Sequence, residues 1–313
     1  MKFYLAPLEG ITGYVYRNTL ETCFPGMDRY FTPFLAPGQK GNFSHREQED
    51  VAPEHNRGMD VVPQILTNRA EDFLRTAEKL KELGYAEVNL NLGCPSRTVV
   101  TKYRGSGFLA KPEELDHFLE EVFARCPTGI SIKTRIGKED RKEWSRILEI
   151  YRKYPLTELI VHPRIQEDFY KNKPDWGAFS LTLADAPWPV CYNGDIVTAE
   201  DYKRLTEVFP GLERVMAGRG VLRNPGLVSR IRDGVMPKKE QIHRFHSMLY
   251  EGYLETIPGA RNVLFKMKEI WVYLHQLFED SEKYAKRIRK AEKFPAYEDA
   301  VAALFAECRL RQE

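Results

Sequence analysis

The chain has 313 residues, a formal net charge of only +2, and hydrophobic and aromatic contents of 42% and 12%. This composition excludes a disordered chain, and the near-zero net charge means that any nucleic-acid surface must be local. The five cysteines are scattered and never at Cys-x-x-Cys spacing, which predicts neither a disulfide framework nor a zinc site. The sequence shows no signal-peptide pattern and no apolar run near ~20 residues, so we predict no membrane segment. Together these features predict a cytoplasmic protein.

Short β-rich runs alternate with amphipathic segments through the first two thirds of the chain. The predicted strands are 3–6, 30–34, 61–66, 87–90, 130–134, 159–162, 190–193 and 214–217. Segments with helical spacing lie between most of them, including 71–83, 112–124, 144–151 and 202–208. Eight strands with helical crossovers predict an α/β fold of the (β/α)8 TIM-barrel type. A doubly wound open sheet is the alternative, but it usually has fewer strands, and no Gly-x-Gly-x-x-Gly follows the first strand.

The strand pattern stops near residue 237. Beyond it, Met267, Trp271, Leu274 and Phe278 follow helical spacing, which is more typical of a helix core than of a binding surface. We therefore predict a catalytic barrel at 1–237 and a small helical domain at 238–313.

A basic helical face occurs late in this second region. On charge alone, a solvated surface is the simpler interpretation of such a run. Its members are Lys283, Lys286, Arg287, Lys290 and Lys293, with Arg289 beside them.

A Gly-Cys-Pro turn follows the predicted strand 87–90. Gly93 and Pro95 flank Cys94, and the fixed φ of proline makes such a turn rigid. With an unperturbed pKa of about 8.5, a thiol carries a proton at neutral pH and can donate it. The turn predicts a positioned proton donor, although an isolated cysteine would more simply be a buried structural thiol.

Polar residues stand at the ends of seven of the eight predicted strands. The active site of a barrel is built from these carboxyl ends, so the residues are expected to share one rim. Taken singly, Gln64 or His162 could instead be a satisfied core polar group. In chain order the residues are Glu9, Gln64, Asn91, Cys94, Lys133, His162, Arg164, Asn193, Asp195 and Arg219.

Glycines after the last two strands predict a phosphate site. Barrels commonly bind phosphate in these loops through backbone N–H groups. Gly194, Gly218 and Gly220 would let the backbone approach an anion, and Arg219 could clamp it. Asn224-Pro225 is then expected to open the next helix. Ordinary loop glycines are the alternative.

Lys133 stands inside a predicted strand that otherwise reads Ile-Ser-Ile-x-Thr. In a core it would be costly without an anionic partner. At a barrel mouth it could face the negative charge at the N1/C2 edge of a reduced flavin, with Gln64 and Asn91 bonding the amide-like edges of the ring. A Schiff-base lysine, as in barrel aldolases, is the competing interpretation, but a flavin also accounts for the phosphate loops and for Cys94.

Together, these motifs resemble the tRNA-dihydrouridine synthases. The resemblance covers the barrel to about Gly234, and the segment 267–271 also resembles that family's helical domain. The motifs are Pro7-Leu8-Glu9-Gly10-Ile11-Thr12, Asn89-x-Asn91-x-Gly93-Cys94-Pro95, Lys133-Thr134-Arg135, His162-x-Arg164, Asn193-Gly194-Asp195 and Gly218-Arg219-Gly220.

The resemblance implies an FMN enzyme that takes electrons from NADPH and reduces the C5=C6 bond of particular uridines in tRNA. Hydride would pass from flavin N5 to C6 of the uracil, and Cys94 would protonate C5. A deep barrel mouth suits an extruded base, and the basic face becomes a contact for the tRNA backbone. The expected protein is a monomer that binds tRNA but no metal and no membrane.

The resemblance also assigns residues by position. Cys94 and Lys133 would be catalytic. FMN would be held by Pro7, Leu8, Glu9, Gln64, Asn91, Lys133, His162, Asn193, Gly194, Asp195, Gly218 and Arg219. The residues expected to contact tRNA are Arg135, Arg164, Lys283, Lys286, Arg287 and Lys290.

Three departures from the family pattern stand out. Pro163 replaces the glycine or alanine that commonly follows the histidine, and Leu8 replaces a frequent methionine at nearly equal volume. Asn172 stands where the family often has glycine in Tyr-x-Gly-x-Ala-Asp-Trp, and we expect it to adopt the left-handed conformation. The changes leave the flavin motifs intact.

Two other functions fit part of the pattern. An FMN-dependent dehydrogenase of a free pyrimidine, of the dihydroorotate or dihydropyrimidine type, would use the same barrel but needs no basic helical extension. A non-catalytic tRNA-binding protein with a degenerate barrel would take up no FMN and would be colourless.

Overall fold

A computed structural model describes residues 1–38 and 42–312. Its strands are β1 (Lys2–Leu5), β2 (Arg29–Phe31), β3 (Val61–Val62), β4 (Gln64–Ile65), β5 (Glu87–Leu92), β6 (Gly129–Arg135), β7 (Leu159–His162), β8 (Val190–Asn193) and β9 (Arg214–Ala217). Contacts divide the described chain into two compact units, each considered by itself. The first comprises Met1–Pro7, Asp28–Asp195 and Gly211–Met216, and the second Leu8–Met27, Ile196–Pro210 and Ala217–Glu313.

The helices also divide between the two units. Those of the first are α2 (His45–Val51), η1 (Pro53–Asn56), α3 (Ala70–Glu82), α4 (Arg97–Val100), η2 (Gly105–Ala110), α5 (Pro112–Arg125), α6 (Glu143–Tyr151), η3 (Gln166–Asp168) and α7 (Trp176–Asp185). Those of the second are α1 (Tyr14–Cys23), α8 (Ala199–Val208), α9 (Arg219–Arg223), α10 (Leu227–Asp233), α11 (Lys239–Thr256), α12 (Ala260–Leu274), η4 (His275–Leu277), α13 (Glu282–Lys290) and α14 (Phe294–Glu307).

The sheet closes into a barrel. The strands of the described chain pair in the order β3-β2-β1-β9-β8-β7-β6-β5-β4, and its two ends are halves of one segment split at Pro63. Proline has no N–H for a ladder hydrogen bond, but its carbonyl still accepts from Asn89 N at 2.8 Å. Since β3 pairs with β2 and β4 with β5, the ring is continuous. With β3 and β4 counted as one strand, the predicted eight-stranded α/β barrel is confirmed.

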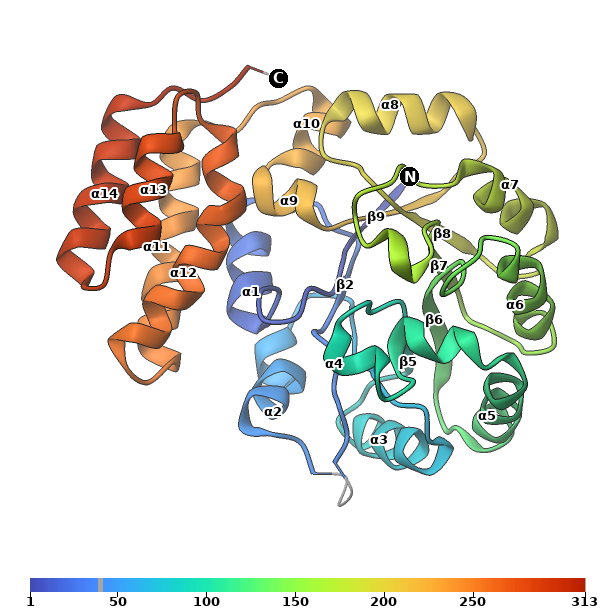
Figure 1. The fold of residues 1–313 in the computed structure, drawn as a ribbon. Helices are drawn as coiled ribbons and strands as arrows, with labels where there is room; N and C mark the ends of the chain where they lie inside the picture. Colours follow the sequence, from blue (N-terminus) through green and yellow to red (C-terminus); the bar gives the residue numbers. More distant parts are fainter. Residues whose placement is uncertain (39–41, 313) are drawn as a thin grey trace. The chain divides into compact units, whose positions relative to one another are not determined.

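Helices cover the outside of the strands in the first unit. The segments predicted at 71–83, 112–124 and 144–151 form α3, α5 and α6 (Figure 1). In α5, Pro112 stands in the first turn, and Leu115, Phe118, Leu119 and Val122 are buried. Their helical spacing places them on one face, so amphipathicity alone sets the face that packs inward.

The barrel interior is apolar at its centre. A buried cluster joins Tyr4 and Ala6 of the first strand segment with Phe31, Ile160 and Met216 of other strands. Side chains from different strands fill this centre, so the barrel is a packed core rather than a pore.

A charged cluster lies just before β7. Glu158 is buried, and its carboxylate accepts from Tyr4 Oη at 3.1 Å and pairs with Arg214 Nε at 3.2 Å and Arg29 Nη1 at 3.8 Å. Burial raises the pKa of Glu158 to about 7, although Arg29 and the Tyr4 hydroxyl oppose the rise.

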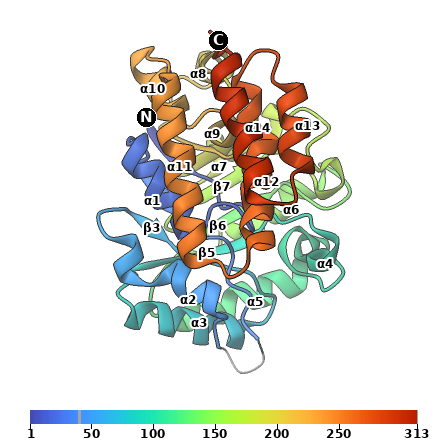
Figure 2. The same cartoon turned by 90° about the vertical axis from the view of Figure 1, so that its left-hand side faces the viewer.

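In the second unit, α11 to α14 pack side by side (Figure 2). The predicted stripe of Met267, Trp271, Leu274 and Phe278 is buried and is core. Trp271 Nε1 donates to Tyr297 Oη at 2.9 Å. The described part of the chain contains no helix long and apolar enough to cross a membrane.

Candidate active site

The Cys94 turn leaves the C-terminal end of β5, and one side chain organises it. Asn91 Oδ1 accepts hydrogen bonds from the backbone N–H groups of Gly93 and Cys94, both at 3.0 Å. On the far side, Ser106 holds the Cys94 carbonyl through its N–H at 3.1 Å and its hydroxyl at 2.8 Å. Within the described chain Cys94 is in no disulfide, and the residue is only partly buried. The structure therefore combines a fixed backbone with a residue that is partly exposed.

A chain of amides ties this turn to the barrel wall. Asn91 Nδ2 donates to Gln64 Oε1 at 2.7 Å, and Gln64 Nε2 donates to Asn89 Oδ1 at 2.8 Å. Asn89 Nδ2 in turn donates to Ser131 Oγ at 2.9 Å. Gln64 is only 1% exposed, so these bonds satisfy groups that water does not reach. Gln64 and Asn91 thus orient the Cys94 turn, whatever else they bind.

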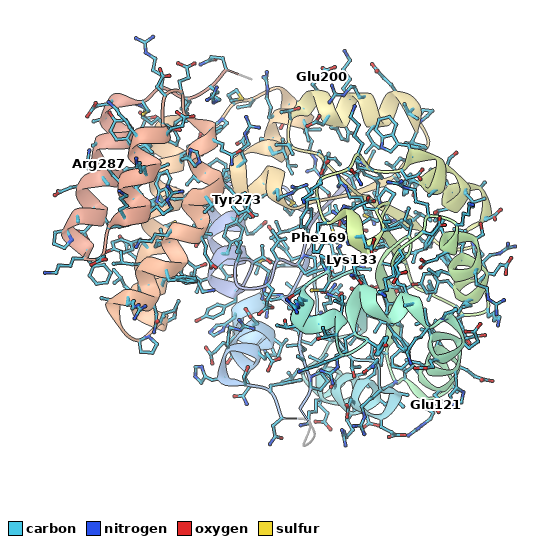
Figure 3. All side chains as sticks on the ribbon, in the orientation of Figure 1. Glu121, Lys133, Phe169, Glu200, Tyr273 and Arg287 are labelled. Carbon is cyan, nitrogen blue, oxygen red and sulfur yellow. The ribbon has the colours of Figure 1, made fainter. Side chains whose placement is uncertain are left out.

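Lys133 lies on β6 directly beside Asn91 in the strand register (Figure 3 labels Lys133). Within the described chain, its ammonium has no hydrogen bond or ion pair with another residue. Burial lowers the pKa of Lys133 to about 8, with Arg135 acting in the same direction and Cys191 and Cys94 opposing. A half-buried lysine without a carboxylate is prepared to meet negative charge from outside the protein.

Arg135 is buried and turned toward the protein. Its guanidinium donates to the carbonyls of Gly93 at 3.0 Å, Ile165 at 2.8 Å and Phe169 at 2.9 Å. It therefore joins the Cys94 turn to the loop after β7. We expected Arg135 to contact tRNA, but all three of these hydrogen bonds are internal, and its placement makes it a brace for two loops.

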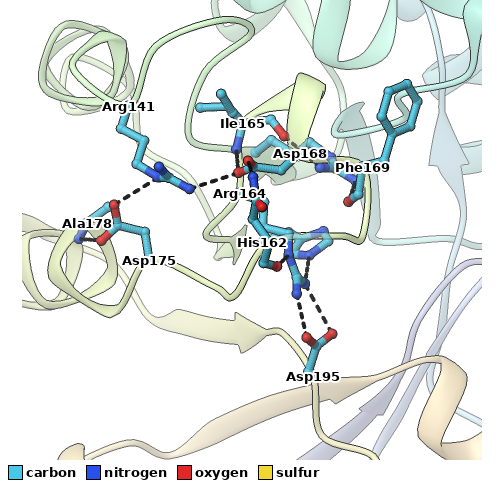
Figure 4. A network of polar contacts seen from close by, with 11 residues as sticks. Arg141, His162, Arg164, Ile165, Asp168, Phe169, Asp175, Ala178 and Asp195 are labelled. Atoms are coloured by element: carbon cyan, nitrogen blue, oxygen red, sulfur yellow. Dashed lines mark hydrogen bonds and ion pairs between the residues drawn. The ribbon is translucent and has the colours of Figure 1, made fainter.

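His162, Arg164 and Asp195 form a second network (Figure 4). Arg164 is 1% exposed and donates to Asp195 Oδ1 at 3.1 Å, with a second bond to Asp195 Oδ2. Its Nη1 lies 2.9 Å from His162 Nε2. A guanidinium only donates, so this histidine nitrogen accepts, and a neutral ring carries its proton on Nδ1. The structure brings the three together, and Arg164 is buried rather than presented on the surface for RNA.

The loop after β7 is held by its own acids. Asp168 accepts from Ile165 N and Arg141 Nη2, both at 3.2 Å, and Arg141 also pairs with Asp175 (Figure 4). The expectation that Asn172 is left-handed is wrong. Asn172 is not among the described residues with positive φ; in this loop Phe169 has φ of 48°, but its ψ of −98° lies outside the left-handed helical region. Asn172 instead accepts from Arg164 Nε at 2.6 Å through its carbonyl.

The segment after β8 contains Gly194, which we predicted to leave room for an anion, but the segment is tightly packed. Asn193 Nδ2 donates to the Met216 carbonyl at 2.9 Å and so holds β9. A Cβ at Gly194 would lie 2.1 Å from Tyr192 Oη, so glycine is needed there for contact with a ring. Glycine is therefore required here by contact with the Tyr192 ring, not by a space for an anion at that Cβ position.

Of the remaining expected cofactor residues, Pro7 ends the first segment of the first unit, and the others lie in the second unit. Leu8 N donates to Thr12 Oγ1 at 2.8 Å, which closes the turn containing Glu9. Gly218 is the N-cap of α9, and Arg219 is the first residue of that helix. A Cβ at Gly220 would lie 2.1 Å from the Ile196 carbonyl, another close internal approach.

The helix expected at Asn224-Pro225 begins later than predicted. The next helix, α10, starts at Leu227. Asn224 Oδ1 accepts from Gly226 N at 3.0 Å, so these residues form a turn between α9 and α10. The side chain competes with helix formation by satisfying a backbone donor locally.

Four of the five residues of the predicted basic face lie on α13, whereas Lys293 lies beyond that helix as the N-cap of α14. Tyr284 and Ile288 are buried on one side of this helix, while Lys283, Lys286 and Arg287 are exposed (Figure 3 labels Arg287). Lys290 ends the helix and is also exposed. The face is therefore available to a polyanion, as its helical spacing indicates.

Sequence reasoning missed two structural partners of the cysteine. Ser106 was not singled out, and Arg135 was assigned outward. The run Gly105-Ser106-Gly107 is the signal that could have identified the first: a Cβ at Gly105 would lie 2.8 Å from the Cys94 carbonyl. Adjacent small residues marked a close backbone approach.

Several known proteins are similar to this chain. The family model described as "Dihydrouridine synthase (Dus)" matches residues 4–311. A protein named "Probable tRNA-dihydrouridine synthase" from Staphylococcus aureus is 28% identical over 269 residues, covering 80% of this chain and 78% of its own length. A "tRNA-dihydrouridine(16) synthase" from Cupriavidus necator is 30% identical over 240 residues, covering 74% of this chain and 73% of its own.

Solved structures are similar in fold. A morphinone reductase in complex with tetrahydroNAD has a TM-score of 0.53 at 13% identity, over 78% of this chain and 90% of that chain. A variant of NCR from Zymomonas mobilis has a TM-score of 0.52 at the same identity and coverage. At this identity the likeness concerns the barrel fold alone.

Proposed function

The chain belongs to the dihydrouridine synthase family, and we propose that it is an FMN-dependent tRNA-dihydrouridine synthase with Cys94 as its general acid. The substrate is a uridine in tRNA, and the product is the 5,6-dihydrouridine. NADPH is the proposed source of electrons, and the cytoplasm is the proposed compartment. The proposed domains are the barrel at 1–237 and a tRNA-binding helical domain at 238–313.

One observation carries the assignment of the acid. Cys94 stands on a turn fixed by Asn91 and Ser106 at the C-terminal end of a barrel strand, and the residue is only partly buried. This end of the strands is where barrel enzymes react. A structural thiol needs neither accessibility nor a backbone clamp on both sides.

The residues of the first unit fit a flavin. Lys133 offers a half-buried ammonium with no partner in the described chain, next in register to Asn91. Such a cation suits the electron-rich edge of a flavin ring. When bound, FMN supplies the hydride that adds to C6 of the uracil.

Two residues of the first unit have defined roles in the proposed FMN site. Lys133 is proposed to stabilise charge at the ring, and His162, as the Nδ1–H tautomer set by Arg164, to present a neutral donor. The full set is Pro7, Leu8, Glu9, Gln64, Asn91, Lys133, His162, Asn193, Gly194, Asp195, Gly218 and Arg219.

The chain's own part in the reaction is the proton. Cys94 donates the proton of its Sγ to C5 of the uracil as C6 is reduced, and solvent then restores the thiol. Asn91 and Ser106 keep the Cys94 backbone in place, and Arg135 links the turn to the loop after β7. The target base must leave the tRNA stack to reach this sulfur.

RNA would be held by charge rather than by base readout. The exposed residues Lys283, Lys286, Arg287 and Lys290 of α13 are proposed to contact phosphates. Arg135 and Arg164 are proposed to act on RNA only indirectly, through the loops that they brace.

A comparison of tRNA from two strains tests this function. Dihydrouridine is mapped in tRNA from cells with and without the gene, and then after return of the wild-type gene or of Cys94→Ala. We expect one or more positions to lose dihydrouridine on deletion and to recover only with the wild-type gene. An unchanged map would reject the proposed activity.

A further inference from the structure

A pocket lies in the second unit where α8, α9, α10, η4 and the C-terminal segment meet. Eleven residues line it, and three of them are arginines: Arg223, Arg230 and Arg311. In the described chain, none of the lining residues is acidic. The neutral polar groups that line it include Thr198, Asn224 and Gln276.

Two of the arginines are fixed by the backbone. Arg230 Nη1 donates to the Gly234 carbonyl at 2.6 Å. Arg311 Nε donates to the Gln276 carbonyl at 3.0 Å, and its main-chain N–H donates to the Leu277 carbonyl at 2.9 Å. Each guanidinium has five N–H donors, so most of them remain for a ligand.

These two charges are not neutralised inside the protein. Across the described residues, neither Arg230 nor Arg311 has a carboxylate partner. Arg230 Nε is buried and has no hydrogen-bond partner in the described chain. Arg230 and Arg311 therefore bring two charges to the pocket lining that no carboxylate of the described chain balances, and an anion in the pocket would balance them.

The acid next to the pocket does not neutralise the positive charge of these arginines. The N-terminus of α8 also lines the pocket, and Thr198 is its N-cap. The neighbouring acid, Asp201, accepts from Val197 N at 3.1 Å and Thr198 N at 3.0 Å and pairs with Arg204. Its carboxylate is therefore already engaged outside the pocket lining.

The pocket is distinct from the proposed flavin-phosphate loop. Arg219 opens α9 and belongs to that loop, whereas Arg223 closes the same helix and belongs to the pocket. The two arginines stand at opposite ends of α9. Arg219 is not among the residues that line the pocket.

We propose that this arginine pocket binds a backbone phosphate of the tRNA. Planar guanidinium groups match phosphate oxygens with paired N–H donors, and fixed arginines lose little freedom on binding. The proposal rests on the proposed function, because tRNA is the polyanion that this enzyme must hold. It adds a phosphate contact to the basic face of α13, in the same unit.

Binding of tRNA to the flavin-loaded protein, measured against KCl concentration, tests the pocket. Arg230→Gln and Arg311→Gln remove charge but keep a donor, and Arg311→Lys keeps charge. Arg152→Gln is the control, since Arg152 is exposed on the barrel unit and faces Asp185 at 3.8 Å. We expect each Gln variant to bind about three- to tenfold more weakly and to lower the salt slope by about one, while Arg311→Lys and the control keep the slope.

The proposal would be overturned if both Gln variants kept the wild-type affinity for tRNA and the wild-type salt slope. It would also be overturned if Arg311→Lys lost as much affinity for tRNA as Arg311→Gln. Thermal unfolding with inorganic phosphate separates the two proposals. If the wild-type protein fails to bind tRNA but phosphate stabilises it and not the Gln variants, the proposed function fails while a phosphate pocket stands. If the wild-type protein forms dihydrouridine normally and both Gln variants bind tRNA as tightly as the wild type, only the proposed pocket is rejected.

Discussion

Asn91→Ala should uncouple the Cys94 turn from the barrel. The substitution removes the acceptor of two backbone hydrogen bonds, from Gly93 N and Cys94 N, and the donor to Gln64 Oε1. Asn91 and Gln64 are 7% and 1% exposed, so water cannot easily replace these bonds. Each bond contributes about 0.5–1.5 kcal/mol net, and an unsatisfied buried acceptor costs about 1–3 kcal/mol.

The expected loss of unfolding free energy is therefore about 2–4 kcal/mol, allowing for some relaxation. Chemical denaturation of wild type and variant measures it. The rate of Cys94 alkylation, with Cys94→Ala as background, reports on the turn without depending on the flavin. We expect that rate to change and dihydrouridine formation to fall by at least about tenfold, because proton transfer needs a placed donor.

Asn91→Asp is the matched control. It keeps both acceptor contacts to the turn and loses the donor to Gln64 Oε1. We expect Asp to retain most of the stability and most of the original alkylation rate. An Ala variant with wild-type stability and thiol reactivity would refute the role given to Asn91.

Three further substitutions follow from the structure. Because the pKa of Lys133 is lowered to about 8, the unfolded chain binds more protons between pH 8 and 10.5, and the apoprotein should gain about 1–3 kcal/mol over this range. Lys133→Met should abolish that gain, and denaturation at several pH values would reveal it. The pKa of Glu158 is raised to about 7, so the folded chain binds more protons between pH 4.5 and 7, and its stability should fall by up to about 3 kcal/mol as the pH rises over this range. Glu158→Gln should flatten this fall. Equal pH profiles of stability for the variant and the wild type would count against the shift. Gly194→Ala places a Cβ 2.3 Å from Tyr192 Cζ, so a melting temperature equal to that of wild type would contradict the packing described here.

The barrel could be predicted from the sequence because its signals are local. All eight predicted strands are present, and the helical faces follow from the spacing of apolar residues. Local patterns did not show that Pro63 divides a strand. Its missing N–H splits one strand into β3 and β4, yet the closed ring tolerates the break because each half pairs with a different neighbour.

Cys94 and Lys133 could be singled out as candidates from the sequence, because a thiol in a rigid turn and a lysine inside a strand are unusual at those places. Their roles in a reaction stay predictions. The inward direction of Arg135 and Arg164 could not be predicted, since their partners are carbonyls and an acid from distant segments. Residue type alone does not distinguish a buried brace from a surface contact.

The arginine pocket lay outside sequence reasoning for a similar reason. Arg311 reaches it only because a β-bridge joins Phe278 with Leu310 and fixes the C-terminal segment beside η4. Nothing in the local pattern of residues 308–312 indicates that pairing. Long-range backbone contacts of this kind appear only in the folded chain.

The central claim is that the Cys94 thiol gives the proton that completes uridine reduction. A single-turnover reaction tests it directly: flavin-loaded protein, reduced beforehand, is mixed with tRNA that lacks dihydrouridine, and the product is quantified by mass spectrometry. The wild-type protein should form dihydrouridine, whereas Cys94→Ala, with equal flavin content, should react about 10² to 10⁴ times more slowly. Equal rates in the two proteins would contradict the claim.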